Sequence, residues 1–508
     1  MPPSSSSVGP TNDIPRPAAV TPQRLSSLAA VAPVTLHGED VDVTGITAAS
    51  DLVRPGDLFA ALPGRTVHGA AYAGAALAAG AVAVLTDPAG RAALPAGVPV
   101  LEVDAVRPVL GAVSAEVYGR PSTGLHVLGV TGTSGKTTTT FLMRAGLQAA
   151  GRTSGLIGTV ATLIDETEVK ARFTTPEAPE FQSLLAVMRE RGVTDVAMEV
   201  SSHALRMGRV DGIGFDVAAF TNLSEDHLDF HDDMEDYFAA KASLFERTER
   251  PVVVVDDEWG VRLAGTMTDP VTVCTNGGTA TWWADDVVEQ PDGSTSFLVH
   301  GPGVELRSGC AIPGRYNVAN ALLALAVLHA TGIPVDVAAP AVAAASVPGR
   351  MERVDEGQPF LAVVDYSHKP AAVDGALRAL RPLTENKLIV VLGCGGDRDR
   401  GKRPHMGEIA ARDADLLVVT DDNPRSEDPA AIRRAMLDGA LAVPSAERAE
   451  VVEVGDRAAA IAAGVAAAGP GDTLLVAGKG HETGQEIHGV IHPFDDRVVL
   501  RAELTARD

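Results

Sequence analysis

Short apolar runs alternate with helix-like segments along most of the chain, and most runs end in a Gly-rich or charged loop. In the first part the runs are brief and surround an Ala-rich segment at 69–79, which we predict to be a helix. The predicted strands there are 41–43, 57–61, 81–85 and 98–103. This pattern predicts a small α/β unit.

Longer apolar runs follow from residue 125, and helix-like segments separate them. Strands that alternate with helices favour a mostly parallel, doubly wound sheet. The predicted strands are 126–130, 195–200, 215–220 and 251–255. Residues 271–305 predict a β-rich insertion, and the apolar run 317–330 predicts a helix.

Beyond residue 348, four apolar strands each pass into a polar loop. Their sequences are AVVDYSHKP, LIVVLGCGGDRDRGKRP, DLLVVTDDNPRSEDP and DTLLVAGKGHETGQE. Open parallel sheets bind ligands beyond the carboxyl ends of their strands. These loops therefore predict a second binding surface.

The composition of the connecting segments divides the chain into four parts. Residues 1–24 are rich in Pro and Ser and lack the basic and apolar regions of a signal peptide, so we predict a disordered tail. We expect α/β domains at 25–124, 125–347 and 348–508.

The net charge of −24 at pH 7 opposes nonspecific binding to nucleic acid or to an anionic membrane, so we expect neither partner. Local basic loops must then hold any anionic substrate. The three cysteines have spacings that suit neither a zinc site nor a disulfide framework. This usage fits a reducing cytosol, and we expect a cytoplasmic protein.

The stretch LGVTGTSGKTTTT, residues 128–140, has the pattern of a buried strand, a glycine loop and a helix start. The glycines allow backbone N–H groups to surround phosphate oxygens at the helix N-terminus. Lys136 would reach the β- and γ-phosphates, and the Thr137 hydroxyl would bind Mg²⁺. Val130 stands where the usual Walker A motif has glycine, so the motif is a variant. It predicts an ATP or GTP site.

Several polar residues follow the predicted central strands. Glu199 ends the run VAMEV, where a carboxylate suits Mg²⁺ directly or through water. The run TNLSEDHLDFH, residues 221–231, can bind a second cation or cap the next helix, and its spacing favours neither. Lys241 alone would be a surface lysine. Arg350 could place a positive charge over a polyphosphate or be a surface arginine of a linker.

The last three C-terminal loops carry groups suited to a charged ligand. Arg398 and Arg425 could pair with a carboxylate or phosphate through two hydrogen bonds. The run AGKGHE adds Lys479, His481 and Glu482. Together the loops predict an anionic or zwitterionic ligand.

Taken together, these motifs resemble the Mur ligases, cytoplasmic enzymes that extend the peptide of the peptidoglycan precursor in cell-wall synthesis. The matching runs occur in the family's order after the tail: GVTGTSGKTT, TTPEAP, MEVSSHAL, TNLSEDHLDFH, YFAAKASLF, PGRYNVANAL, VPGRMER, VDYSHKP, GCGGDRDRGKRP, DNPRSEDP and AGKGHE. The resemblance implies a domain that grips a UDP substrate, a central P-loop ATPase and a C-terminal Rossmann-like domain.

The resemblance also implies how ATP and Mg²⁺ are held. The residues implied at the phosphates are Gly132, Thr133, Ser134, Gly135, Lys136, Thr137, Thr138 and Arg350, with Asn320 at the adenine and Asp365 at the ribose. Thr137, Glu199, His227 and Lys241 would serve the Mg²⁺ sites. Lys241 would be carbamylated for this purpose. The family's reaction would require Lys136, Glu199, His227, Lys241 and Arg350 for catalysis.

Two further sets of residues match the family's substrate positions. Those implied to hold a UDP-muramoyl dipeptide are Ser50, Thr174, Thr175, Ser201 and Arg209, and those implied at the amino-acid site are Arg398, Asp422, Asn423, Pro424, Arg425, Gly478 and Glu482. The sequence departs from the family around Ser50, in AASD, and at Met207, where some relatives have Gln. The DNPR run resembles members that add diaminopimelate, whose distal carboxylate a guanidinium can pair with.

The resemblance thus implies an ATP-dependent ligase that adds meso-2,6-diaminopimelate to UDP-N-acetylmuramoyl-L-alanyl-D-glutamate through an acyl phosphate. The alternatives with the same chemistry are a lysine-adding member, a later Mur ligase and a folylpolyglutamate synthetase. A P-loop NTPase that hydrolyses ATP to switch partners, and a scaffold that has lost catalysis, are rivals of other classes. We expect a monomer.

Overall fold

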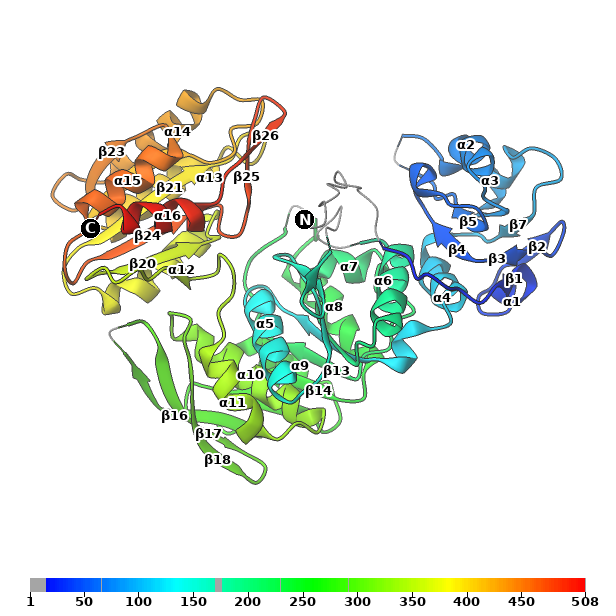
Figure 1. The fold of residues 1–508 in the computed structure, drawn as a ribbon, viewed down its shortest axis with the longest axis horizontal. Helices are drawn as coiled ribbons and strands as arrows, with labels where there is room; N and C mark the ends of the chain where they lie inside the picture. The colour runs from blue at the N-terminus through cyan, green and yellow to red at the C-terminus, as the bar shows by residue number, and fades with distance from the viewer. Residues whose placement is uncertain (1–14, 65, 170–175, 229, 291, 508) are drawn as a thin grey trace, which may run out of the picture. The chain divides into compact units, whose positions relative to one another are not determined.

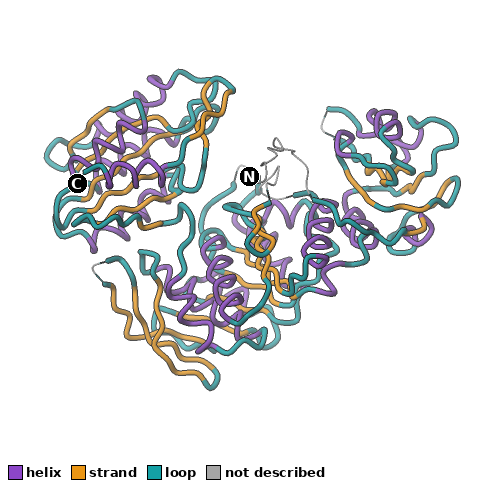
Figure 2. The backbone as a smooth tube through the Cα atoms, in the orientation of Figure 1, coloured by secondary structure: helices purple, strands orange, loops and turns teal. Residues whose placement is uncertain are grey.

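The computed structural model describes residues 15–507 apart from 65, 170–175, 229 and 291 (Figure 1). The chain divides into two compact units. The first comprises Met1–Trp282 and Leu323–Ala338, and the second comprises Trp283–Leu322 and Ala339–Asp508. Helices and strands alternate through most of the chain (Figure 2).

The N-terminal part of the first unit contains a five-stranded sheet in the order β2-β7-β6-β5-β4. Strand β2 is antiparallel to β7, and the other pairs are parallel. The strands are β2 Thr35–His37, β4 Gly45–Thr47, β5 Asp57–Ala60, β6 Ala83–Thr86 and β7 Val100–Glu102, and the helices are α1 Leu25–Ala29, α2 Ala73–Ala78, α3 Pro88–Ala92 and α4 Arg107–Val117. Their apolar residues form a buried core, so the expected small α/β unit is present.

Residues 15–24 lie against folded parts of the chain, whereas we assigned them to a disordered tail. The Arg16 guanidinium donates to the buried Asp57 carboxylate at 2.5 Å, and the Ser183 hydroxyl donates to the Pro15 carbonyl at 3.0 Å. Strand β1 (Gln23–Arg24) pairs antiparallel with β3 (Asp42–Val43). The Pro-rich composition concealed these long-range contacts. Residues 1–14 lie outside the described part.

The central sheet has eleven strands in the order β11-β10-β9-β12-β8-β13-β14-β15-β16-β17-β18. The pairs from β9 to β15 are parallel, and β10–β11 and β16–β18 form antiparallel extensions. The strands are β8 His126–Thr131, β9 Ser154–Ile157, β10 Thr162–Ile164, β11 Thr167–Glu168, β12 Asp195–Glu199, β13 Val217–Phe220, β14 Pro251–Val254, β15 Val271–Cys274, β16 Trp282–Glu289, β17 Thr295–Gly301 and β18 Val304–Cys310. The β-rich insertion is therefore confirmed.

Seven helices accompany this sheet in the described part of the chain. They are α5 Lys136–Ala149, α6 Ala178–Glu190, α7 Ser202–Arg206, α8 Met234–Ala242, α9 Glu258–Ala264, α10 Tyr316–Ala330 and α11 Val335–Ala344. Helix α10 confirms the predicted apolar helix at 317–330.

The C-terminal sheet of the second unit has six strands in the order β19-β20-β24-β21-β22-β23. All pairs are parallel except β19–β20. The strands are β19 Glu352–Arg353, β20 Leu361–Asp365, β21 Leu388–Cys394, β22 Leu416–Asp421, β23 Glu450–Glu453 and β24 Thr473–Ala477, and the helices are α12 Pro370–Leu380, α13 Lys402–Asp413, α14 Pro429–Ala442, α15 Arg457–Ala467 and α16 Asp496–Thr505.

A hairpin between β24 and α16 was not predicted. Its strands are β25 Gly484–Ile487 and β26 Val490–Pro493. The surface-exposed β26 lacks the buried apolar run that identified the other strands.

The structure confirms the mostly parallel α/β architecture. Across the described residues, no helix is both long and apolar enough to cross a membrane. Cys274, Cys310 and Cys394 are buried and free.

Candidate active site

The glycine loop between β8 and α5 has a backbone that only small residues can form. Gly132 has φ +145°, and a Cβ there would lie 1.8 Å from the Thr221 hydroxyl. Gly135 precedes α5 with φ +87°. The Lys136 ammonium donates to the Gly132 and Thr133 carbonyls at 2.8 and 2.9 Å. The lysine thus lies beside the loop whose N–H groups would bind phosphate.

The first two residues of the TNLSEDHLDFH run brace this loop. The Thr221 hydroxyl donates to the Ser134 carbonyl at 2.6 Å, and the Asn222 side-chain oxygen accepts from the Ser134 N–H at 3.1 Å. The next helix, α8, is capped instead by Asp233. Helix capping is therefore not the function of the run itself.

Lys241 is buried under the phosphate loop rather than lying on the surface. Its side chain is 1% exposed, and its ammonium donates to the Gly132 carbonyl at 2.7 Å. It lies 4.5 Å from the centre of the Tyr237 ring. Burial, and secondarily the Lys136 charge, holds the pKa of Lys241 well below its ordinary value. A neutral amine at this place can react with carbon dioxide.

Two of the residues implied for Mg²⁺ lie at the end of β12 and after β13, the strands on either side of β8. The Glu199 carboxylate ends β12 and accepts from the Thr159 N–H at 2.8 Å and the Thr159 hydroxyl at 3.0 Å. His227 has φ +55°, and its ring centre is 4.9 Å from that of His203. Within the described ranges, no group of three or more His, Cys, Asp or Glu side chains gathers as a metal site.

The oxygen donors nevertheless fit Mg²⁺, which keeps several waters and takes only one or two protein carboxylates beside phosphate oxygens. Thr137 at the start of α5 and Glu199 at the adjacent strand end supply a hydroxyl and a carboxylate. A carbamate on Lys241 would add further oxygens.

The residues implied for adenosine and phosphate in the second unit are also held in place. The Asp365 carboxylate accepts from the Met351 N–H at 2.7 Å and the Ser367 N–H at 2.9 Å. The Arg350 guanidinium stacks on the Tyr366 ring at 4.5 Å, and its buried Nε has no hydrogen-bond partner among the described residues. This orphaned donor suits an anionic ligand.

The loops after β22 and β24 meet, as the sheet argument predicted. Asn423 donates to the Glu482 carboxylate at 2.8 Å, and both accept from the Lys479 ammonium, at 3.0 and 3.1 Å. Lys479 is completely buried. The sequence placed it in a loop expected to bind a charged ligand, without a role of its own. Its position next to Gly478 is the only sequence signal of its role.

Arg425 is fixed by the unpredicted hairpin. Its N–H donates to the Glu486 carbonyl at 2.9 Å, and its carbonyl accepts from the His488 N–H at 2.7 Å. Its guanidinium donates to the Gly396 carbonyl at 2.6 Å and lies 3.3 Å from the Glu486 carboxylate. Arg398 is exposed on the loop after β21.

The residues implied for the UDP substrate are only partly described. The Ser201 hydroxyl caps α7 by accepting from the Ala204 N–H at 3.1 Å. Arg209 pairs with Glu177 at 3.1 Å. Ser50 begins a short 3₁₀ helix, Ser50–Leu52. Thr174 and Thr175 lie outside the described residues.

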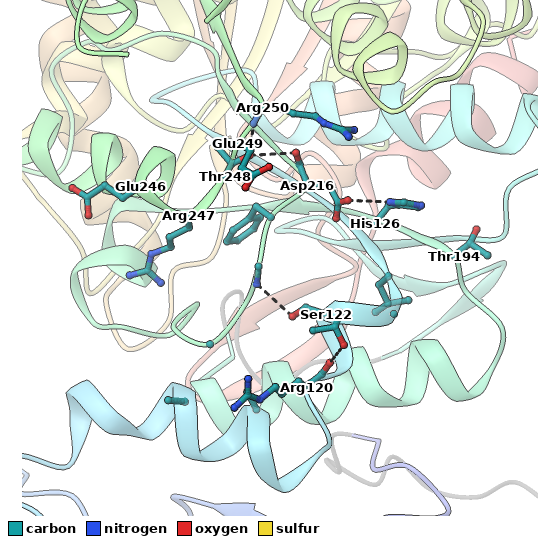
Figure 3. Close-up of a pocket in the computed structure, with 18 of the residues that line it drawn as sticks. Arg120, Ser122, His126, Thr194, Asp216, Glu246, Arg247, Thr248, Glu249 and Arg250 are labelled. Atoms are coloured by element: carbon teal, nitrogen blue, oxygen red, sulfur yellow. Dashed lines mark hydrogen bonds and ion pairs between the residues drawn. The ribbon is translucent and has the colours of Figure 1, made fainter. Parts of the chain in front are cut away.

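A cavity of about 1180 Å³ lies at the opposite, amino ends of β8, β12 and β13 (Figure 3). His126 contacts Asp216 at 3.0 Å there, and the Ser122 hydroxyl accepts from the Gly214 N–H at 3.3 Å. Because ligands of parallel sheets bind at the carboxyl ends, this cavity is not the candidate active site.

Comparisons with known proteins identify the family of the chain. Models of the Mur ligase family match three regions, namely its catalytic domain at 42–118, its middle domain at 130–328 and its glutamate ligase domain at 349–480. A UDP-N-acetylmuramoyl-L-alanyl-D-glutamate–2,6-diaminopimelate ligase of Streptomyces avermitilis is 55% identical over 495 residues, which cover 96% of this chain and 97% of the relative.

Two other relatives agree with this match. A UDP-N-acetylmuramyl-tripeptide synthetase of Leifsonia xyli is 43% identical, covering 96% of this chain and 98% of its own. A solved structure of a UDP-N-acetylmuramoyl-L-alanyl-D-glutamate–2,6-diaminopimelate ligase has 30% identity and a TM-score of 0.70, covering 94% of this chain and 99% of that one. The chain belongs to the Mur ligase family.

Proposed function

We propose that this protein is an ATP-dependent ligase that joins meso-2,6-diaminopimelate to the D-glutamate of UDP-N-acetylmuramoyl-L-alanyl-D-glutamate. The 55% identity to a relative that is named for this activity supports the substrates. The observation that carries the proposal within the chain is the buried Lys241 below a phosphate loop that also holds Lys136. The reaction belongs to peptidoglycan precursor synthesis.

In the first step, a carboxylate oxygen of the D-glutamate side chain attacks the γ-phosphorus of ATP. The bond to the β-phosphate oxygen breaks, and ADP and an acyl phosphate form. Lys136 and Arg350 would balance the charge on the transferring phosphoryl group. Bound Mg²⁺, held by Thr137, Glu199 and His227, would add electrostatic stabilisation of the same oxygens.

Carbamylation of Lys241 would convert the buried amine into a carboxylate. The low pKa of Lys241 favours the neutral amine that attacks carbon dioxide. Its distance of 2.7 Å from the Gly132 carbonyl puts the new group next to the phosphate loop. The carbamate would then help to hold the second Mg²⁺.

In the second step, the diaminopimelate amine attacks the activated carbonyl, the bond to phosphate breaks, and an amide forms. Asp422, Asn423, Gly478 and Glu482 would hold the zwitterionic substrate, and Arg425 would pair with the distal carboxylate that lysine lacks. Arg398 would contribute from its exposed loop. No covalent intermediate with the protein is needed.

Parallel ligation assays with meso-diaminopimelate and L-lysine test the proposal. We expect ATP-dependent amide formation with diaminopimelate and at least a ~100-fold lower kcat/KM with lysine, because the site loses a charged partner. Equal use of both amino acids would contradict the specificity. ATP consumption without amide formation would contradict the ligase function.

An Arg425→Ala variant tests whether this one side chain causes the preference for diaminopimelate over lysine. We expect it to lose most of the preference for diaminopimelate over lysine, and Arg400→Ala, in an exposed residue of the same domain, is the control. An unchanged preference would exclude Arg425 as its source.

We further propose that the enzyme acts in the cytoplasm as a monomer.

A further inference from the structure

Arg457 is among the largest completely buried side chains of the described chain. It is the first residue of α15, and Asp496 is the first residue of α16. Two hydrogen bonds of 2.7 Å, from Nε and Nη2, join the guanidinium to the two oxygens of the Asp496 carboxylate. Both side chains are 0% exposed.

This placement of an arginine is costly. A buried cation loses its hydration, and a positive charge at a helix N-terminus opposes the helix dipole. Burial alone would lower the pKa of Arg457, but nearby carboxylates, Asp496 first and then Asp422 and Glu482, outweigh this effect and the pKa is raised. The residue therefore carries a full charge inside the domain, and its remaining N–H groups must find acceptors.

Those N–H groups reach the ends of two strands that are not neighbours. Nη1 donates to the Asp421 carbonyl at 3.2 Å, and Nη2 donates to the Ala477 carbonyl at 3.0 Å. Asp421 ends β22 and Ala477 ends β24, with β21 between them in the sheet. The next residues along the chain are Asp422 and Gly478, which begin two of the amino-acid loops.

The two loops approach each other closely at this point. Gly478 has φ +119°, and a Cβ there would lie 2.6 Å from the Asp422 carboxylate. The Lys479 ammonium then joins Asn423 of one loop to Glu482 of the other. A small shift of either strand end would therefore change the spacing between Asp422 and Asn423 of one loop and Glu482 of the other.

We propose that Arg457, held by Asp496, is a positioning residue that sets the spacing of the two loops around the amino-acid substrate. The proposal rests on the proposed function, since it assumes that these loops bind the amino acid. Arg457 is buried beneath them and does not touch the substrate. Its planar guanidinium reaches two carbonyls and a carboxylate at once, which an ammonium cannot do with the same geometry.

Steady-state kinetics of the full chain test the proposal. The first variant is Arg457→Lys, which keeps the positive charge but loses the planar set of N–H donors. The second is Asp496→Asn, which keeps the arginine but removes the negative charge that pairs with it. Arg501→Lys is the matched control, because Arg501 lies in α16, is half exposed and pairs with Glu356 at 2.8 Å. KM is measured for meso-diaminopimelate and for the UDP-muramoyl dipeptide, together with kcat and the melting temperature.

We expect the KM for diaminopimelate to rise about tenfold or more in both test variants, because displaced binding groups lose affinity steeply with distance. The KM for the UDP-muramoyl dipeptide should change by less than about threefold. Arg501→Lys should match the wild type in both constants. This KM pattern is one that a general loss of folded protein cannot give, since fewer active molecules lower only the apparent kcat.

A lower melting temperature with unchanged KM values would show a purely structural pair and overturn the proposal. Wild-type behaviour of Arg457→Lys would overturn it too. If Arg457→Lys does not fold, the KM of Asp496→Asn decides alone in the same way. Failure of the proposed function is distinct from these outcomes, because the wild type would then form no amide with diaminopimelate.

Discussion

At the scale of single residues, Lys241 combines burial with a hydrogen bond to the Gly132 carbonyl and a position 4.5 Å from the centre of the Tyr237 ring. We predict that ¹³C-labelled bicarbonate gives a carbamate signal in the NMR spectrum of the wild type that Lys241→Arg lacks. We also expect the variant to lose at least ~100-fold in kcat, as when an electrostatic group at the phosphoryl site is removed. A full-rate Lys241→Arg enzyme would contradict the assignment.

Gly132 gives a second residue-scale prediction. In Gly132→Ala the new methyl group would overlap the Thr221 hydroxyl and approach the Asn222 backbone at 3.0 Å, at a φ that alanine disfavours. The loop must move, so we expect binding of a nonhydrolysable ATP analogue to weaken by at least ~30-fold in calorimetry. Gly74→Ala is the control, because a Cβ there meets nothing within 4 Å. Equal binding by both variants would mean that the loop does not hold phosphate.

Glu180 provides a prediction about pH. Burial, and secondarily Glu177, raises the pKa of this carboxyl from 4.5 to about 7. The folded protein then binds the proton more tightly than the unfolded chain, so the contribution of Glu180 to stability falls as pH rises from about 4.5 to about 7. Above that range the ionised group costs as much as about 3 kcal/mol.

We therefore expect Glu180→Gln to be more stable than the wild type at pH 8 and equal to it at pH 4.5. Urea unfolding at the two pH values measures the difference. The exposed Glu168→Gln serves as the control. A stability gain of the same size at both pH values would contradict the raised pKa.

Functional residues that belong to a short local motif could be predicted from the sequence. Residues whose role depends on contacts with distant parts of the chain could not. Gly132 and Lys136 stand together in one run, so the phosphate loop could be predicted. Arg457 and Asp496 are 39 positions apart and look like ordinary first-turn residues of two helices. Only the fold brings them together.

At the scale of elements, the hairpin β25–β26 supports the loop that carries Arg425. Gln485 donates to the Asp422 carbonyl at 2.7 Å, and the Glu486 N–H donates to the Asn423 side chain at 3.0 Å. We predict that Gln485→Ala raises the KM for diaminopimelate about tenfold, because Asp422 loses its anchor. Ile491→Ala, at a residue of β26 that is 72% exposed, should have no effect. Steady-state kinetics would contradict the prediction if both variants behaved alike.

The parallel strands could be predicted because each is a continuous apolar run that ends in a polar loop. The hairpin could not, because its burial pattern carries no alternation and β26 is exposed along its length. The same holds for β23, whose ends are exposed glutamates. Edge and surface strands are specified by their partners rather than by their own composition.

At the scale of the whole molecule, Lys136 belongs to the first compact unit and Arg425 to the second. If Lys136 serves the phosphoryl step and Arg425 serves only the amino-acid step, loss of each side chain should stop a different step. We predict that Arg425→Ala still forms the acyl phosphate from ATP and the UDP-muramoyl dipeptide, as positional isotope exchange in ATP measures. Lys136→Ala should lose that exchange by ~100-fold or more. Loss of exchange in both variants would contradict this division.

The contact between the hairpin and the Asp422–Arg425 loop also has a consequence for how such enzymes diversify. Exchange of residues Asp422–Arg425 alone should not change the amino-acid preference. These residues form hydrogen bonds with Gln485 and Glu486, some sixty positions later in the chain. We therefore expect chimeras that exchange both segments to retain turnover where exchange of one segment alone does not.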